Sequence, residues 1–138
     1  MADPKDPVAR FHAYIAAFNR QDYAVLAGHY AADVELVIGN GTRLAGPQAI
    51  VDFYRGVNEA TTRRIEIVQA FADGDRLAAE LRSEFLALRD APHFTSGPMA
   101  RGDRLLINSF AFYDLREGRY ARIRAAVFRR EWRRAGSA

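Results

Sequence analysis

The amino-acid sequence predicts an α+β fold in which three N-terminal helices pack on one face of a curved, mostly antiparallel sheet. Three observations lead to this prediction. Apolar residues recur at helical spacing in three segments before residue 60, a short alternating hairpin separates the second helix from the third, and four long alternating segments follow. Because short helices cannot cover such a sheet completely, we expect a cone-shaped apolar pocket between the two layers.

Each predicted helix has one apolar face, and proline lies at or near the start of two of them. The first covers residues 5–20, with Pro4 and Pro7 near its start, and the third begins at Gly46-Pro47, with proline at the first helical position. A short second helix follows "NRQD". The apolar faces are Phe11, Ile15 and Phe18 in the first helix, Tyr23, Leu26, Ala27 and Tyr30 in the second, and Ile50, Phe53, Tyr54 and Val57 in the third.

The predicted strands alternate in polarity and are joined by tight turns. Val34, Leu36 and Ile38 alternate before "GNG", which predicts a hairpin within "DVELVIGNGTRLAG". Two long antiparallel pairs follow, one across "DGD" and one across "REG", and the loop "DAPHFTSGPMARG" connects them. The four long strands are predicted at residues 63–72, 75–89, 104–115 and 119–130.

Composition limits the possible classes of protein. A length of 138 residues predicts one domain over residues 1–138, and the absence of cysteine excludes disulfides and thiolate chemistry. The three histidines have no metal-ligand spacing, so we expect neither a metal nor a cofactor. No apolar run is long enough to span a bilayer, and "MADPKDPVAR" lacks a signal-peptide layout. We therefore expect a cytoplasmic protein without a membrane partner.

The net charge of +3 does not indicate a nucleic-acid partner. Much of the excess lies in the tail "RREWRR", whereas acidic residues are interleaved elsewhere. Nucleic-acid binding proteins usually show a basic stripe on a known module, or aromatic residues spaced for stacking, and this sequence shows neither.

Polar side chains interrupt the apolar faces at four positions. Tyr14, Tyr30 and Tyr54 each place a phenol on an apolar helix face, and a buried hydroxyl needs a hydrogen-bond partner. In "LLINSFAF", Asn108 alternates with Leu106 and Phe110, so we expect its amide on an otherwise apolar face. Asn108 is either a core residue bonded to nearby backbone or a donor that points into the pocket.

The chain resembles the NTF2-like superfamily, in its SnoaL-like and ketosteroid-isomerase-like branch, and is most similar there to ketosteroid isomerase. "YIAAFNRQD" is similar to the family's first helix, "HYAADVEL" to its second helix and first strand, "GPQAIVDFY" to its third helix, and "INSFAFYDLREGRYARIRAAVF" to its final hairpin. The resemblance extends from about residue 8 to residue 128. It implies a cystatin-like cone of three helices on the curved sheet, closed around an apolar pocket.

The resemblance also implies roles for the four polar residues. In ketosteroid isomerase a tyrosine and a protonated aspartate donate hydrogen bonds to the developing enolate oxygen. Tyr14 matches that tyrosine and Asn108 matches that aspartate, and an amide can donate at any pH. Tyr54 and Tyr30 match tyrosines that support the first one.

The catalytic base of this family has no counterpart in the chain. Its proton-shuttling carboxylate falls at Ile38, which cannot accept a proton. Glu35 lies on the opposite side of that strand, and Asp114 is roughly 20 Å from Asn108 along its own strand. The late acids used by limonene-epoxide hydrolases and polyketide cyclases of this fold have no match in "RIRAAVF" either.

Taken with the resemblance, these features predict a protein that binds a hydrophobic carbonyl or phenolic small molecule through an oxyanion hole made by Tyr14 and Asn108. Steroid isomerase activity by enolisation is the first expectation, and a non-catalytic ligand-binding or dimerisation module is the alternative. Leu86, Leu88, Phe112 and Tyr113 exceed what one core needs, which predicts a homodimer. The expected apolar pocket walls are Phe18, Ile38, Phe53, Val57, Leu106, Phe110, Ile123, Ala125 and Val127.

Overall fold

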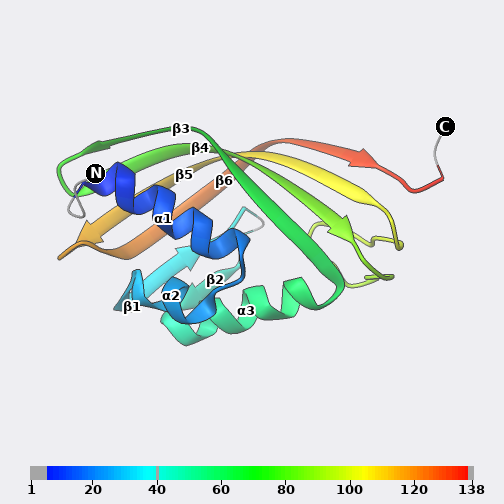
Figure 1. The fold of residues 1–138 in the computed structure, drawn as a ribbon, viewed down its shortest axis with the longest axis horizontal. Helices are drawn as coiled ribbons and strands as arrows, with labels where there is room; N and C mark the ends of the chain where they lie inside the picture. The colour runs from blue at the N-terminus through cyan, green and yellow to red at the C-terminus, as the bar shows by residue number, and fades with distance from the viewer. Residues whose placement is uncertain (1–5, 40, 137–138) are drawn as a thin grey trace.

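The computed structural model describes residues 6–39 and 41–136 and contains three helices and six strands (Figure 1). The helices are α1 (Pro7–Asn19), α2 (Tyr23–Gly28) and α3 (Pro47–Ala60). Asp6 caps α1 by accepting hydrogen bonds from the backbone N–H groups of Val8 and Ala9, and Asp22 caps α2 in the same way through Val25. The helix start predicted at Gly46-Pro47 is confirmed, and α1 begins at Pro7, within the segment predicted as residues 5–20.

The six strands form one sheet in the order β2-β1-β6-β5-β4-β3. Neighbouring strands are antiparallel except β1 and β6, which run parallel, so the predicted mostly antiparallel sheet is confirmed. Parallel pairing is possible here because the sequence between the two strands supplies a long crossover connection. The strands are β1 (Tyr30–Val37), β2 (Arg43–Ala45), β3 (Thr61–Asp73), β4 (Arg76–Ala87), β5 (Arg104–Arg116) and β6 (Arg119–Arg133).

The helices cover one face of the sheet, as the sequence predicts. Figure 1 shows strands β3 to β6 as a long curved layer, with α1 lying against it and α2 and α3 beside β1 and β2. The main core lies between these layers and includes the buried residues Phe11, Leu26, Ile50 and Leu77. A smaller cluster around Phe85 and Leu105 extends the core under the loop between β4 and β5. None of the described helices is long and apolar enough to cross a membrane.

The second helix is shorter than predicted, and Tyr30 is not part of it. The helix ends at Gly28, His29 caps it, and Tyr30 is the first residue of β1. The carbonyl of His29 accepts a hydrogen bond from the backbone N–H of Tyr120 at 2.9 Å, and Tyr30 pairs with Tyr120 across the sheet. Strand β1 therefore begins at Tyr30, the residue at which the predicted second helix was to end. The side chain of Tyr30 is still buried in the core.

Two bulges interrupt the pairing of β5 with β6, and one of them lies beside the cavity. Asn108 pairs with Arg129 and Ser109 pairs with Val127, so Phe128 has no partner on β5. A bulge of this kind bends the strand and changes which side chains share a face. Val127 and Arg130 consequently both line the cavity on the helix side of the sheet. Phe128, which lies between them in the sequence, faces outward and stacks on Phe110 at a ring-centroid distance of 4.4 Å.

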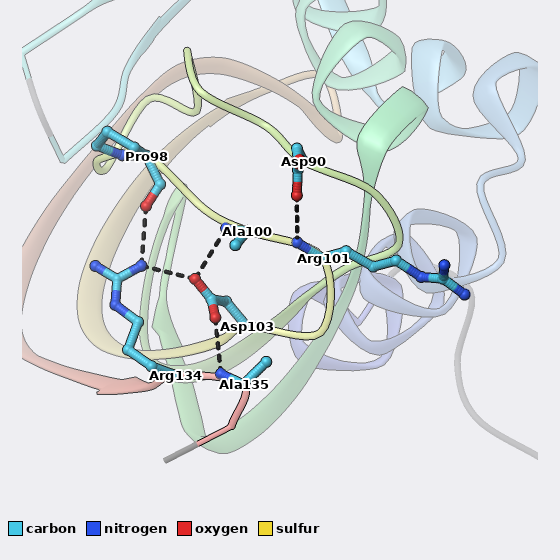
Figure 2. Close-up of polar contacts among 7 residues, drawn as sticks. All are labelled: Asp90, Pro98, Ala100, Arg101, Asp103, Arg134 and Ala135. Atoms are coloured by element: carbon cyan, nitrogen blue, oxygen red, sulfur yellow. Dashed lines mark hydrogen bonds and ion pairs between the residues drawn. The ribbon is translucent and has the colours of Figure 1, made fainter.

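A buried carboxylate anchors the loop between β4 and β5 to the end of the chain (Figure 2). Asp103 is 4% exposed, and its side chain accepts hydrogen bonds from the backbone N–H groups of Ala100 and Ala135, at 2.9 and 2.8 Å. Arg134 donates to the same carboxylate at 2.9 Å and to the carbonyl of Pro98 at 2.9 Å. These backbone hydrogen bonds, with the Arg134 guanidinium, lower the pKa of Asp103 to about 2.

Candidate functional site

A cavity of about 260 Å³ lies between the helices and the inner face of the sheet. Side chains from α1, α3, the end of β1, strands β3 to β6 and the loop between β4 and β5 form its wall. Most of these side chains are aliphatic or aromatic, as is usual for a small-molecule pocket. Of the residues expected in the pocket wall, the structure places these seven there: Phe18, Ile38, Phe53, Val57, Ile123, Ala125 and Val127.

Asn108, Leu106 and Phe110 do not line this cavity, so the prediction that they face it is wrong. The inward side of β5 consists of Ile107, Ser109, Ala111 and Tyr113, which line the cavity, and the intervening residues point to the other face of the sheet. Asn108 lies there between Arg82 and Arg129 of the neighbouring strands, and Phe110 is 49% exposed. The oxyanion hole predicted from Tyr14 and Asn108 is therefore not formed.

The alternation in β5 is misleading because both of its faces are largely apolar. Leu106, Phe110 and Phe112 lie on the outward face, whereas Ile107 and Ala111 lie on the inward face. A strand that is apolar on one face only would reveal its orientation by hydrophobicity, but this strand does not. The polar residue that does reach the cavity from β5 is Ser109, next to Asn108 in the sequence.

Tyr14 lies in the cavity wall and is hydrogen-bonded to Tyr30. Their hydroxyl oxygens are 2.7 Å apart, and either hydroxyl can be the donor. Tyr30 is 3% exposed and lies behind Tyr14, outside the cavity lining. Burial raises the pKa of both phenols well above the ordinary value, and the neighbouring tyrosines add to this effect for Tyr14. Both hydroxyls are therefore protonated at neutral pH and can act as hydrogen-bond donors.

Two further phenols reach the cavity. Tyr54 projects from α3 and packs edge-to-face on Phe18, at a centroid distance of 4.6 Å, rather than making the hydrogen bond to Tyr14 that the resemblance implies. Tyr113 projects from β5 with its ring 6.3 Å from that of Tyr14. Burial raises the pKa of Tyr54 and of Tyr113. Sequence analysis assigned Tyr113 to a surplus of apolar residues, but its alternation with Ser109 and Ala111 places it inside.

The cavity wall also contains Arg63 of β3, a cation that was not among the predicted site residues. Its guanidinium carbon lies 4.9 Å from the ring centroid of Phe85, 5.2 Å from that of Phe18 and 5.8 Å from that of Tyr54. Distances below about 6 Å are typical of cation–π contacts. The signal that could have revealed it is the alternation of Arg63 with Ile65, which also lines the cavity.

Polar groups also surround the outer part of the cavity. Thr95 and Ser96 come from the loop that Asp103 anchors, and Arg130 comes from β6 just beyond the bulge. Thr95 and Arg130 are exposed, so they mark the side of the cavity nearest to solvent. The cavity thus has an aromatic inner part with phenol donors and a polar outer part.

The cavity wall offers hydrogen-bond donors but no evident base. Among the described residues that line it, none is an aspartate, a glutamate or a histidine, and Ile38 stands where the resemblance places the base. His29 packs on the ring of Tyr14 at 5.4 Å but lies outside the lining, and burial, with Arg10 nearby, lowers its pKa. The described part of the chain also contains no group of three or more His, Asp or Glu placed to hold a metal ion.

The fold and the cavity together define the class of protein. Three helices on a curved, open, mostly antiparallel sheet, with an apolar cavity between them, form the α+β cone of the NTF2-like superfamily. Residues 11–123 match the family model of the SnoaL-like domain, and the chain belongs to this family.

Solved structures with this fold include proteins assigned to several activities. A protein from Xanthomonas campestris pv. campestris, provisionally assigned as a polyketide cyclase, is 25% identical over 87% of this chain and 88% of its own, with a TM-score of 0.76. One from Pseudomonas putida KT2440 with the same provisional assignment is 30% identical over 83% and 86%, with a TM-score of 0.71.

A third similar structure, from Kribbella flavida, is provisionally assigned as a ketosteroid isomerase. It is 14% identical over 88% of this chain and 76% of its own, with a TM-score of 0.65, and at this identity it shows a shared fold only. No curated protein matches the chain.

Proposed function

We propose that this protein binds a hydrophobic, mainly aromatic small molecule and that Tyr14 donates a hydrogen bond to a carbonyl or phenolic oxygen of that molecule. The observation that carries the proposal is the 2.7 Å contact between the Tyr14 and Tyr30 hydroxyls in the wall of an apolar cavity. When Tyr30 donates to Tyr14, the proton of Tyr14 is free to point into the cavity. Chains of hydrogen bonds strengthen one another in a low-dielectric site.

If the protein is an enzyme, its chemistry is enolisation of the bound carbonyl. A donor fixed in a site without water stabilises negative charge that develops on oxygen in the transition state. The similar structures provisionally assigned as polyketide cyclases make this class of reaction the first one to test. Since none of the described lining residues is a carboxylate, the base would be a water molecule or a group on the substrate. Loss of a positioned base slows such reactions roughly 10²–10⁴-fold.

The alternative function is ligand binding without catalysis, which the absence of acidic and imidazole groups from the described cavity wall favours. Exchange of the protons on the carbon next to a carbonyl distinguishes enolisation from ligand binding alone, because a protein that only binds the ligand would not accelerate this exchange. We expect Ile38→Asp to raise the exchange rate of 2-tetralone roughly 10²-fold or more, since Ile38 already lies in the cavity wall. Ile38→Asn is the control, because it has the same shape and cannot act as a base. Equal rates in the two variants would contradict the proposed enolisation site.

The binding proposal is tested with 2-naphthol and with naphthalene, which lacks the hydroxyl. We expect Tyr14→Phe to weaken 2-naphthol binding about tenfold and to leave naphthalene binding unchanged, as measured by fluorescence titration. Tyr23→Phe is the matched control, because Tyr23 accepts a hydrogen bond from Asn58 and does not line the cavity. Equal loss of both ligands, or no loss, would contradict a role of Tyr14 as the donor.

We also propose that a second copy of this chain covers the outer face of the sheet. Phe110, Phe112 and Phe128 lie there and are 49%, 59% and 51% exposed, which is unusual for aromatic residues so close together. Charges of both signs flank them, including the Asp114–Arg124 ion pair, and a face that carries both signs can pair with a second copy of itself under two-fold symmetry.

The dimer is tested by light scattering after size exclusion. We expect a dimer for the unmodified protein and a monomer for Phe110→Lys. Val25→Lys removes an exposed apolar residue on α2, away from this face, and should leave the dimer intact. A monomeric unmodified protein would refute this proposal without affecting the cavity.

A further inference from the structure

The cavity contains a cation that no acidic residue in the described part of the chain neutralises. Arg63 is half-buried, it takes part in none of the ion pairs among the described residues, and no aspartate or glutamate lines the cavity beside it. Arginine stays protonated under all ordinary conditions. Partial removal of a charged group from water without a counter-charge raises the free energy of the ligand-free protein.

The hydrogen bonds of Arg63 are also incomplete. Its Nη2 donates to the Ser83 hydroxyl at 3.2 Å, and its Nε is buried without any acceptor in the described part of the chain. The guanidinium carries five N–H donors in one plane. The Tyr54 hydroxyl is a further hydrogen-bond partner, and Phe18 and Phe85 pack against the guanidinium within cation–π distance. These contacts hold the side chain in place, and all of these partners are uncharged.

The positive charge acts on the same cavity as the phenols. Tyr54 lies beside Arg63, and the guanidinium opposes the effect of burial on the pKa of both Tyr54 and Tyr113. A second arginine, Arg130, lines the exposed side of the cavity. Every ionised side chain in the described lining is therefore cationic, which favours entry of an anion.

We infer that the natural ligand carries an acidic group, a carboxylate or an ionised phenol or enol, and that Arg63 anchors this group while the aromatic body fills the cavity. The inference rests on the proposed function and adds the charge of the ligand to it. An anion would provide the acceptor that the guanidinium lacks, and charge-assisted hydrogen bonds of this kind are about twice as strong as neutral ones. The cation–π contacts with Phe18 and Phe85 hold the guanidinium in position before the ligand arrives.

Two probes of nearly the same shape test the inference: 2-naphthoate, which is anionic at pH 7, and 2-acetylnaphthalene, its neutral methyl ketone. Isothermal titration of the unmodified protein should show tighter binding of 2-naphthoate, about tenfold to a hundredfold. We expect Arg63→Gln to abolish this preference, so that the variant binds the two probes with similar affinity.

Arg64→Gln is the matched control. Arg64 is the next residue in β3, it is exposed on the outward face opposite Glu84, and its loss changes the net charge by the same amount. The preference for 2-naphthoate should survive in this variant. If Arg64→Gln removes the preference equally, the effect is one of overall charge and the inference is wrong.

The outcomes separate this inference from the proposed function. If the unmodified protein binds the ketone through Tyr14 but binds 2-naphthoate no better, the anion inference fails and the proposed function stands. If it binds neither probe, the proposed function fails. If Arg63→Gln does not fold, the preference of the unmodified protein for 2-naphthoate over the ketone still tests the inference. Arg63→Lys keeps the charge but loses the planar guanidinium, and this variant should retain part of the preference.

Discussion

Asp103 and Arg63 are two charged side chains that the fold removes partly or wholly from water, and their surroundings differ in one respect. Asp103 accepts hydrogen bonds from two backbone N–H groups and from Arg134 (Figure 2). Arg63 has two hydroxyl partners, Ser83 and Tyr54, and a buried Nε without an acceptor among the described residues. The chain itself supplies the hydrogen-bond partners of the Asp103 carboxylate, which we call the complete site. The Arg63 guanidinium, the incomplete site, would obtain its missing acceptor from a bound ligand. The comparison indicates that a charged group that stabilises the fold has its hydrogen-bond partners within the protein, whereas a charged group that binds a ligand lacks some of them.

The largest expected effect comes from breaking the complete site. Asp103→Ala leaves two backbone N–H groups and Arg134 without their acceptor, and unpaired buried donors are strongly unfavourable. We expect the melting temperature to fall by roughly 5–10 °C, measured by circular dichroism. Asp90→Ala is the control, because Asp90 is exposed and accepts only from the backbone N–H of Arg101, and it should have a much smaller effect.

An effect of intermediate size is expected from acid. The pKa of Asp103 is lowered to about 2 in the folded protein from an ordinary value of 3.8. Since the folded pKa lies below the unfolded one, the carboxylate stabilises the fold above about pH 4, and this contribution disappears as the pH falls toward 2. Urea unfolding at pH 6, 4 and 3 should therefore show the gap between the unmodified protein and Asp103→Ala closing at low pH. A constant gap would mean that the carboxylate is not the stabilising group.

The smallest effect on stability is expected at the incomplete site. Arg63→Met removes a charge that no acidic residue neutralises and replaces it with an apolar side chain that can contact the same rings. We expect the melting temperature to stay within about 2 °C of the unmodified value or to rise, although the affinity for anionic probes falls. A loss as large as that of Asp103→Ala would show that Arg63 serves the fold, and the comparison would no longer hold.

Much of the fold could be predicted from the sequence because its signals are local. The prolines at positions 7 and 47 mark two helix starts, and each long strand ends at a turn-forming segment such as "DGD" or "REG". Tyr14 and Tyr54 could be placed in the cavity because each lies on the single apolar face of its helix. Within such elements, hydrophobic periodicity determines orientation.

The rest of the site depends on information that the sequence pattern does not contain. β5 is apolar on both faces, so the side on which Asn108 lies could not be inferred from alternation. Arg63 alternates with Ile65, but arginine is mostly exposed in proteins, so a cation in the cavity could not be inferred from this pattern alone. Tyr30 kept its predicted partner Tyr14 although it lies on a strand rather than a helix.

The unpaired Phe128 in β6 makes both faces of the sheet sensitive to a change in the length of this strand. Substitutions on a regular strand alter one side of a sheet at a time, but gaining or losing one residue here would move Arg130 relative to Val127 and displace Phe128 from its stack on Phe110. Ligand preference and self-association would then shift together, in a single genetic step. Natural variants that differ in length at this position are therefore the ones in which both properties should diverge at once.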